Sequence, residues 1–254
     1  MPELDKKISW IVNFAILNIK TRYQSTYLGL GWAALEPLLY FSILYVVFNS
    51  IRDTGEDFAI YLITGVMLFH MFTRGTSGGL NSLTRNSGII KSINTNKIFF
   101  PIVSTVATLI LGIVDISIFF VLMSVFQFVP DWTIILLPIP IFLLFLLIQG
   151  ISYFLSVVNV MIRDIQYLWI IIIHSLLFIS PIFWKIPDAK EGVLLTIQQI
   201  NPLGQVIELT HKIVLDGTIP SLDEWAHTTG IIVGVFLLGY FIFHILERKI
   251  TERL

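Results

Sequence analysis

Six long apolar stretches divide this chain, and they limit its fold more than any other feature. A helix of roughly 20 apolar residues crosses the hydrocarbon core of a bilayer. Several of the stretches are apolar on every face, which is typical of helices surrounded by lipid or by other helices. The sequence therefore predicts an all-α membrane protein with one transmembrane domain over residues 1–254. Its six expected transmembrane helices cover about residues 28–48, 58–80, 99–128, 133–160, 165–184 and 228–247.

Composition and motifs narrow the class of protein further. Charged residues make up 13% of the chain and hydrophobic residues 56%, whereas a soluble domain carries about 25% charged residues. The net charge of −1 argues against a nucleic-acid partner. The sequence has no phosphate-binding G-x-x-x-x-G-K-[ST] motif and no cluster with metal-ligand spacing. We expect no catalytic residue, no metal site and no cofactor in this chain.

The distribution of basic residues predicts the orientation in the membrane. Even-numbered spans place twelve of the sixteen Lys and Arg residues on one side. The other side holds Arg52, Lys185, Lys190 and Lys212. Because positive charge marks the cytoplasmic side, we expect a multi-pass protein of the cytoplasmic (inner) membrane with both termini in the cytoplasm.

Before the first span, apolar and polar residues alternate with helical spacing. This pattern predicts an amphipathic helix over residues 4–22 that lies along the membrane surface. Trp10, Phe14 and Leu17 interrupt its polar face. These three side chains either anchor the helix in the interface or face a second protein. The expected apolar face consists of Leu4, Ile8, Ile11, Val12, Ala15 and Ile19.

Two further segments are not expected to cross the membrane. Residues 73–100 are polar and too long for a simple turn, which predicts the cytoplasmic end of the second span followed by a short helix parallel to the membrane. Residues 193–216 predict two short outer helices, 193–200 and 202–215, with Asn201 as N-cap and Pro202 first in the second helix. About 14 residues reach only roughly 21 Å. We therefore expect a re-entrant or surface hairpin.

Two acids fall within the expected spans. Asp115 lies near the middle of the third span, where a charge is costly unless it is paired or faces water. It either lines a polar path, contacts a group such as His174, is bonded to a neighbouring helix or is protonated. Glu36 lies close to the cytoplasmic end of the first span.

Aromatic residues follow helical spacing in the first two spans. They face lipid as interfacial aromatics, or they line a conduit in which aromatic planes stack against sugar rings. The candidate conduit residues are Tyr40, Phe41, Tyr45, Phe48, Phe69 and Phe72.

Several short motifs occur in a consistent order. The first, within residues 20–39, includes Arg22, Tyr23, Leu28, Gly29, Trp32 and Pro37. Others are Y-L-I-T-G at 61–65, G-I-I-K at 88–91, K-I-F-F-P at 97–101, R-D-I-Q-Y-L at 163–168, S-P-I-F at 180–183, and N-P-L at 201–203 followed by Glu208. Together they resemble permease subunits of bacterial polysaccharide ABC exporters, which include the O-antigen (Wzm-like), capsule and teichoic acid exporters. Glu36 departs from the family, which usually has an amide there.

This resemblance implies a mechanism. Such permeases form homodimers, associate with two ABC ATPase subunits that carry ATP and Mg, and pass a lipid-linked polysaccharide, here of O-antigen type. Residues 85–100 would couple the ATPase to the membrane helices, and 193–216 would be outer gate helices. The implied coupling residues are Arg85, Lys91, Lys97, Phe99, Phe100 and Pro101. Those at the cytoplasmic mouth are Arg22, Tyr23, Tyr27, Trp32 and Glu36. Those of the outer gate are Pro181, Phe183, Asn201, Pro202 and Glu208.

Alternatives stay open at this point. Lys91 and Lys97 either contact an acidic groove of the ATPase or face anionic membrane lipids. A permease for small lipids or drugs has the same architecture, because a fold does not determine a cargo. An intramembrane lipid-modifying enzyme is disfavoured because paired ionisable residues in the spans are not evident.

Overall fold

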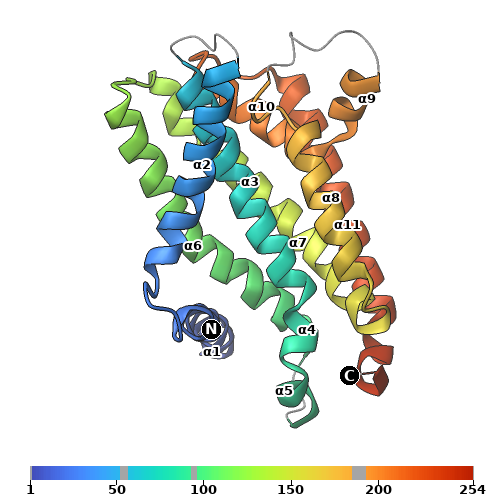
Figure 1. The fold of residues 1–254 in the computed structure, drawn as a ribbon. Coiled ribbons are helices and arrows are strands. Elements are labelled where there is room, and N and C mark those ends of the chain that lie inside the picture. Colours follow the sequence, from blue (N-terminus) through green and yellow to red (C-terminus); the bar gives the residue numbers. More distant parts are fainter. Residues whose placement is uncertain (1, 52–56, 93–95, 185–192, 254) are drawn as a thin grey trace.

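The regular structure is entirely helical in the residues that the computed structural model describes, which are 2–51, 57–92, 96–184 and 193–253 (Figure 1). The prediction of an all-α membrane protein is confirmed. The elements are α1 (Pro2–Tyr23), α2 (Gly31–Ile51), α3 (Phe58–Leu80), α4 (Ser82–Arg85), α5 (Ser87–Ser92), α6 (Phe99–Val125), the 3-10 helix η1 (Trp132–Leu136), α7 (Pro138–Met161), α8 (Ile165–Ile179), α9 (Val193–Ile200), α10 (Pro202–Val214) and α11 (Leu222–Arg253).

Within these ranges, five helical segments are long and apolar enough to cross a membrane: α2, α3, α6, η1 with α7, and α11. The apolar helix α8 has only 15 residues. It ends at Ile179, earlier than the expected end at 184, because Pro181 follows and holds Ser180 in an extended conformation. Helix α2 begins at Gly31, later than expected, because residues 24–30 form turns in which Gly29 adopts a φ of 53°.

Helix α3 is the centre of the bundle and is buried over nearly its whole length. It packs against α6 and α7, and α7 packs against α11. Helices α2 and α8 lie at the edge, and both expose many of their side chains. Because α2 and α8 lie at the edge, polar side chains that point from them toward α3 remain accessible from outside the bundle.

Two glycines bring α7 and α11 into unusually close contact. A Cβ atom at Gly239 would lie 2.0 Å from the backbone oxygen of Gly150, and one at Gly150 would lie 2.6 Å from the Cα of Phe236. Small residues allow such close packing of membrane helices. Larger side chains at either position would push the two backbones apart.

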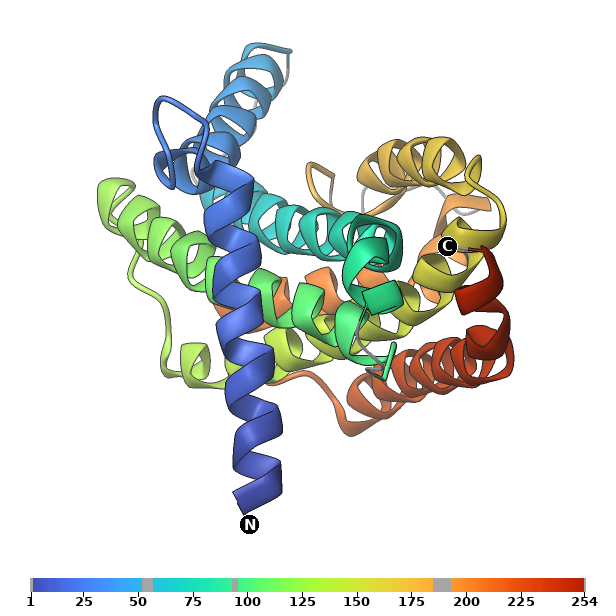
Figure 2. The same ribbon diagram turned by 90° about the horizontal axis from the view of Figure 1, so that it is seen from below.

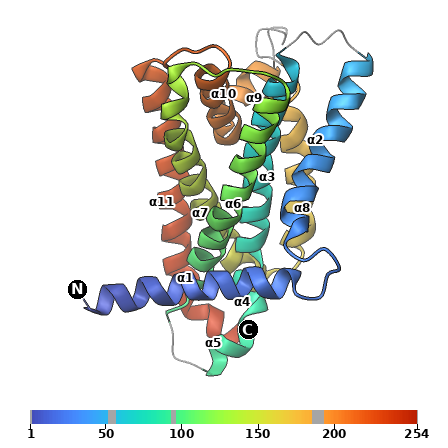
Figure 3. The same ribbon diagram turned by 90° about the vertical axis from the view of Figure 1, so that its left-hand side faces the viewer.

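The two ends of the bundle differ. Helix α1 lies across one end, nearly perpendicular to the long helices, together with α4, α5 and the end of α11 (Figures 2 and 3). The short helices α9 and α10 lie at the opposite end (Figure 1). Both termini are therefore at the same end of the bundle.

Helix α1 packs against the bundle with only part of its expected apolar face. Of the expected apolar face, Ala15 and Ile19 are buried against the bundle, Ile8 and Val12 are exposed, and the side chain of Leu4 lies outside those described. Phe14, which interrupts the polar face in the sequence, packs against Phe100 at the start of α6 with ring centroids 6.1 Å apart. The buried side of α1 includes Phe14 because α1 packs against α6 there.

Helices α9 and α10 are two short helices, as predicted. Asn201 occupies the N-cap position and Pro202 begins α10, but the Asn201 side chain makes no capping bond. Its Nδ2 instead donates to Ser180 Oγ at 2.9 Å. Asn201 thereby ties α10 to the end of α8.

Candidate functional site

A cluster of ionisable residues lies inside the bundle and joins three helices. The Arg74 guanidinium of α3 pairs with the Asp115 carboxylate of α6, with Nη1 2.9 Å from Oδ2. His70, one turn before Arg74, has its Nδ1 3.2 Å from Asp115 Oδ1 and its Nε2 3.5 Å from Glu36 Oε2 on α2. The Asp115 side chain is fully buried, whereas that of Glu36 is 55% exposed.

The contacts of His70 restrict where its proton lies. Its Nδ1 is also 2.9 Å from Arg74 Nη2, and a guanidinium nitrogen donates and never accepts. A neutral imidazole therefore accepts from Arg74 at Nδ1 and carries its hydrogen on Nε2, which faces Glu36. A charged imidazole donates to Asp115 and still directs Nε2–H at Glu36. Either form links α3 to α2.

This cluster settles the surroundings of Asp115. The alternative that it is bonded to a neighbouring helix is confirmed, and the contact with His174 is wrong, since His174 Nδ1 lies 2.8 Å from Ile170 O on its own helix. Arg74 falls within the expected second span, 58–80, but no motif in the sequence predicts its pairing with Asp115. The signal that would have placed it is its four-residue spacing from His70, which puts both on one helical face.

A groove on one side of the bundle contains the exposed part of this cluster. Its floor is α3 and its walls are α2 and α8, with a cavity of about 260 Å³. Polar groups from all three helices face it, although these helices are mainly apolar. The lining residues are Glu36, Tyr40, Phe69, His70, Thr73, Ser77, Ile170, Ile173, His174 and Leu177.

The six candidate conduit aromatics do not share one environment. Tyr40 and Phe69 line the groove, whereas Phe41 and Phe72 are packed into the core. Phe41 stacks on Tyr45 with centroids 5.7 Å apart. Phe48 stacks on Phe183, beyond the end of α8, with centroids 4.6 Å apart. The structure therefore brings two of the six to the groove of a single chain.

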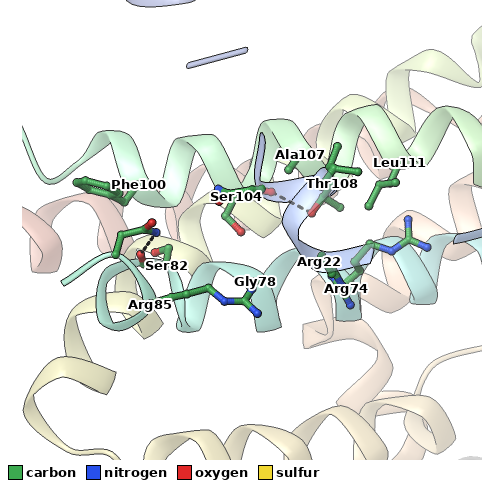
Figure 4. Close-up of a pocket in the computed structure, with 13 residues that line it drawn as sticks. Arg22, Arg74, Gly78, Ser82, Arg85, Phe100, Ser104, Ala107, Thr108 and Leu111 are labelled. Atoms are coloured by element: carbon green, nitrogen blue, oxygen red, sulfur yellow. Dashed lines mark hydrogen bonds between the residues drawn. The ribbon is translucent and has the colours of Figure 1, made fainter. Parts of the chain in front are cut away.

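A cavity near α1 is lined by polar and apolar residues (Figure 4), and a second cavity shares several of these residues. The inner cavity is about 60 Å³ and the more open outer one about 540 Å³. Arg22 of α1, Arg74 and Gly78 of α3, and Arg85 of α4 line both. No carboxylate lines either cavity among the described residues. Arg22, expected at the cytoplasmic mouth, and Arg85, expected in the coupling segment, thus share one site.

The expected coupling residues lie partly on the surface and partly in the core. Residues 85–100 include α5 and the start of α6, while 93–95 lie outside the described residues. Lys91 is exposed, but Phe100 is buried in a cluster with Leu83 and Ile90. Lys97 Nζ donates to the Glu247 backbone oxygen at 3.0 Å. Phe99 lies against Trp10, and Pro101 is buried in the first turn of α6.

The remaining residues of the expected cytoplasmic mouth lie around the turn between α1 and α2. Tyr23 is buried, Trp32 is partly exposed and Tyr27 is fully exposed. A fully exposed tyrosine at a turn has no packing role within the chain.

At the opposite end, Glu208 of α10 lines a cavity of about 210 Å³ with Gln198, Lys212 and Glu224. Burial raises the pKa of the Glu208 carboxyl; nearby Lys212 opposes this effect, and Asp216 and Glu224 add to it. Lys212 is ion-paired with Glu224. Pro181 is buried and Phe183 is half-buried in the segment after α8.

The fold and these sites define a class: a helical membrane bundle with polar residues gathered along one side and at both ends. The chain belongs to the ABC-2 type transporter family, whose sequence model matches residues 14–215. Among curated relatives, an O-antigen export system permease protein RfbA of Klebsiella pneumoniae is 25% identical over 92% of this chain and 91% of its own length. The RfbA of Myxococcus xanthus is 18% identical over 84% and 83%. The polysialic acid transport protein KpsM of Escherichia coli is 28% identical over 79% of each.

Proposed function

We propose that this chain is the transmembrane subunit of an ATP-driven exporter, and that two copies form the conduit for a lipid-linked polysaccharide of O-antigen type across the cytoplasmic membrane. Membership of the ABC-2 family supports the transport role. The relatives are named for O-antigen export and for polysialic acid transport, which favours a polysaccharide over a drug or a small lipid.

The groove between α2, α3 and α8 is the observation that carries this proposal. Glu36, Tyr40, Ser77 and His174 reach it from apolar helices. Polar side chains facing hydrocarbon are costly, so ionisable residues in spans face a water-filled path or another protein. A second copy placed against α2 and α8 provides both: protein contact at the rim and an enclosed polar path between the two floors.

A separate pair of ABC ATPases would supply the energy at the end that holds α1, α4, α5 and both termini. The twelve basic residues predicted to be cytoplasmic favour this orientation. Exposed Lys91 on α5 suits contact with an acidic surface. Closure of the two ATPases would move this end of the bundle. Helix α3 would transmit the movement to the groove, because α4 directly follows α3.

The ionisable cluster does not favour an intramembrane enzyme. The sequence showed no paired ionisable residues in the spans, whereas the structure pairs Arg74 with Asp115. The Asp115 carboxylate is, however, fully buried by this contact. An acid held in this way has no free face for a substrate. Transport therefore remains the function that the site supports.

The test is co-expression of the chain with the ATPase encoded beside it, followed by purification and reconstitution into liposomes. We expect a complex with two copies of each subunit, ATP hydrolysis that depends on this chain, and loss of surface glycan in cells that lack it. Recovery of the chain only as a monomer without an ATPase would refute the proposal. Intact surface glycan in deletion cells would refute the assigned cargo.

A further inference from the structure

Three arginines converge on the two cavities near α1. Figure 4 shows Arg85 extending toward Gly78, with Arg22 and Arg74 beside one another. Within the described part of the chain, neither Arg22 nor Arg85 forms an ion pair with a carboxylate. Arg74 is paired with Asp115, which lines neither cavity. The Arg22 and Arg85 guanidinium groups therefore add positive charge to the cavity walls, which no lining carboxylate offsets; Glu36 acts on Arg22 only from outside the cavities.

Arg74 has a donor that nothing in the described residues satisfies. Its side chain is only 3% exposed, and its Nη1 and Nη2 face Asp115 and His70. Its Nε is buried without a hydrogen-bond partner. A buried donor of a charged group left unsatisfied is costly. A shift of the Arg74 side chain toward the cavity would expose this N–H to an acceptor from outside the chain and remove this cost.

The chemistry of the lining favours phosphate oxygens. Guanidinium groups bind phosphate through pairs of N–H bonds that match pairs of oxygens. The neighbouring side chains offer few free donors, because Ser82 Oγ donates to Gly79 O at 2.6 Å and Asn81 Nδ2 to Ser77 O at 3.1 Å. The arginines are thus the main donors. The outer cavity of about 540 Å³ accommodates more than a single phosphate.

The position of the site favours a lipid as the source of that phosphate. Arg74 lies six residues before the end of α3 at Leu80, or about 9 Å along the helix. Arg85 lies just beyond that end, and Arg22 belongs to α1, which crosses the bundle at the same level (Figure 3). Lipid headgroups lie where transmembrane helices end. An anionic headgroup would reach the arginines there without crossing the hydrocarbon core.

We infer that the cavities lined by Arg22, Arg74 and Arg85 bind the phosphate groups of a lipid headgroup. This inference rests on the proposed function, since the lipid would be the one that carries the exported glycan. The site would hold the charged headgroup at the end of the bundle that faces the ATPases, while the lipid chain stays in the membrane and the glycan points toward the groove.

The test measures binding to the complex of this chain with its ATPase in phosphatidylcholine nanodiscs. One arm uses a fluorescent polyprenyl diphosphate added to the discs, and the other uses inorganic pyrophosphate in solution. Arg22→Gln and Arg85→Gln change side chains that are exposed in the chain, so the bundle is expected to fold. Arg248→Gln, an exposed arginine on α11 at the same end, is the matched control.

We expect each substitution in the site to weaken binding of the lipid diphosphate about tenfold, the effect of one hydrogen bond to a charged group, and Arg248→Gln to leave it within about twofold of wild type. Free pyrophosphate is expected to bind much more weakly than the lipid. Unchanged lipid affinity in both Arg22→Gln and Arg85→Gln overturns the site. Equal affinity for free pyrophosphate overturns the lipid as its source.

Glycan export is measured separately in cells. Arginine-dependent lipid binding without any glycan export would refute the proposed function and leave the binding site standing. Glycan export together with arginine-independent binding would refute the site alone.

Discussion

The Arg74 guanidinium and the Asp115 carboxylate form an ion pair between α3 and α6, with Nη1 2.9 Å from Oδ2 and both side chains almost fully excluded from solvent. Removal of both charges from such a pair is often tolerated, whereas removal of one leaves the other buried without compensation. Because His70 extends the pair to Glu36 on α2, the same contact also positions a wall of the groove.

The first prediction concerns this pair. We expect Asp115→Leu to lower the free energy of unfolding by about 3–5 kcal/mol, because Arg74 then stays charged and unpaired in the core. The double variant Asp115→Leu with Arg74→Met removes both charges and is expected to recover most of that loss. Thermal and denaturant unfolding of the detergent-solubilised chain measure both. A double variant as unstable as the single one would show that the pair is not the cause.

The second prediction concerns the close contact of α7 and α11. A methyl group at Gly239 would clash with a backbone oxygen, which cannot move aside as a side chain would. We expect Gly239→Ala to destabilise the fold by about 1–3 kcal/mol, the usual effect of overpacking. Gly234, on the same helix, has open space where its Cβ would be. Gly234→Ala is expected to be neutral or to stabilise by up to about 1 kcal/mol, and similar losses for both variants would contradict the close contact.

Much of the helical framework was predictable because apolar length is a strong local signal. The helix Phe58–Leu80 has the limits expected for the second span, and α9 and α10 follow from their Pro, Asn and Gly positions. Helix ends set by tertiary contacts were harder to predict. Asn201 was identified as a cap from residue type alone, although its side chain is used to bind Ser180 on another element.

The candidate site was less predictable because its residues come together only in three dimensions. Arg74 falls within the expected second span, but the sequence around it does not indicate that its side chain pairs with an acid of the third span. Glu36, His70 and Asp115 are far apart in the sequence, and no local pattern relates them. Likewise, nothing in residues 4–22 indicates that Phe14 packs against Phe100, since that contact depends on where α1 crosses α6.

The third prediction tests whether the groove is a polar path. The chain has no cysteine, so a thiol reagent labels only the cysteine that is introduced. We expect Tyr40→Cys and His174→Cys to react with a charged maleimide in membranes that contain the assembled transporter. Phe241 on α11 is 63% exposed in the chain and is expected to face lipid, so Phe241→Cys should react slowly. Equal rates at all three positions would contradict a water-filled groove.

The fourth prediction concerns coupling to the ATPase. Phe100 and Pro101 are buried, so changes there would test folding and not coupling. Lys91 on α5 is exposed and suits contact with an acidic partner. We expect Lys91→Glu to reduce ATP-driven export at least about tenfold, the cost of placing a like charge in an interface, with normal membrane insertion. The control is Lys249→Glu, an exposed lysine at the same end, and export that is equally unaffected in both variants would argue against α5 as the contact.

The fifth prediction concerns pH at the opposite end. Burial raises the pKa of Glu208 above its ordinary value of 4.5, so the folded chain holds this proton more tightly than the unfolded chain does. Stability therefore falls as the pH rises from about 4.5 through the raised pKa, because the ionised carboxylate is disfavoured only in the folded state. We expect Glu208→Gln, which resembles the neutral form, to raise the thermal unfolding midpoint at pH 7 and to leave it unchanged near pH 4. Asp223→Asn, an exposed acid at the same end, should change it at neither pH. A lower midpoint for Glu208→Gln at pH 7 would mean that the ionised carboxylate stabilises this end of the bundle, through Lys212, more than its burial costs.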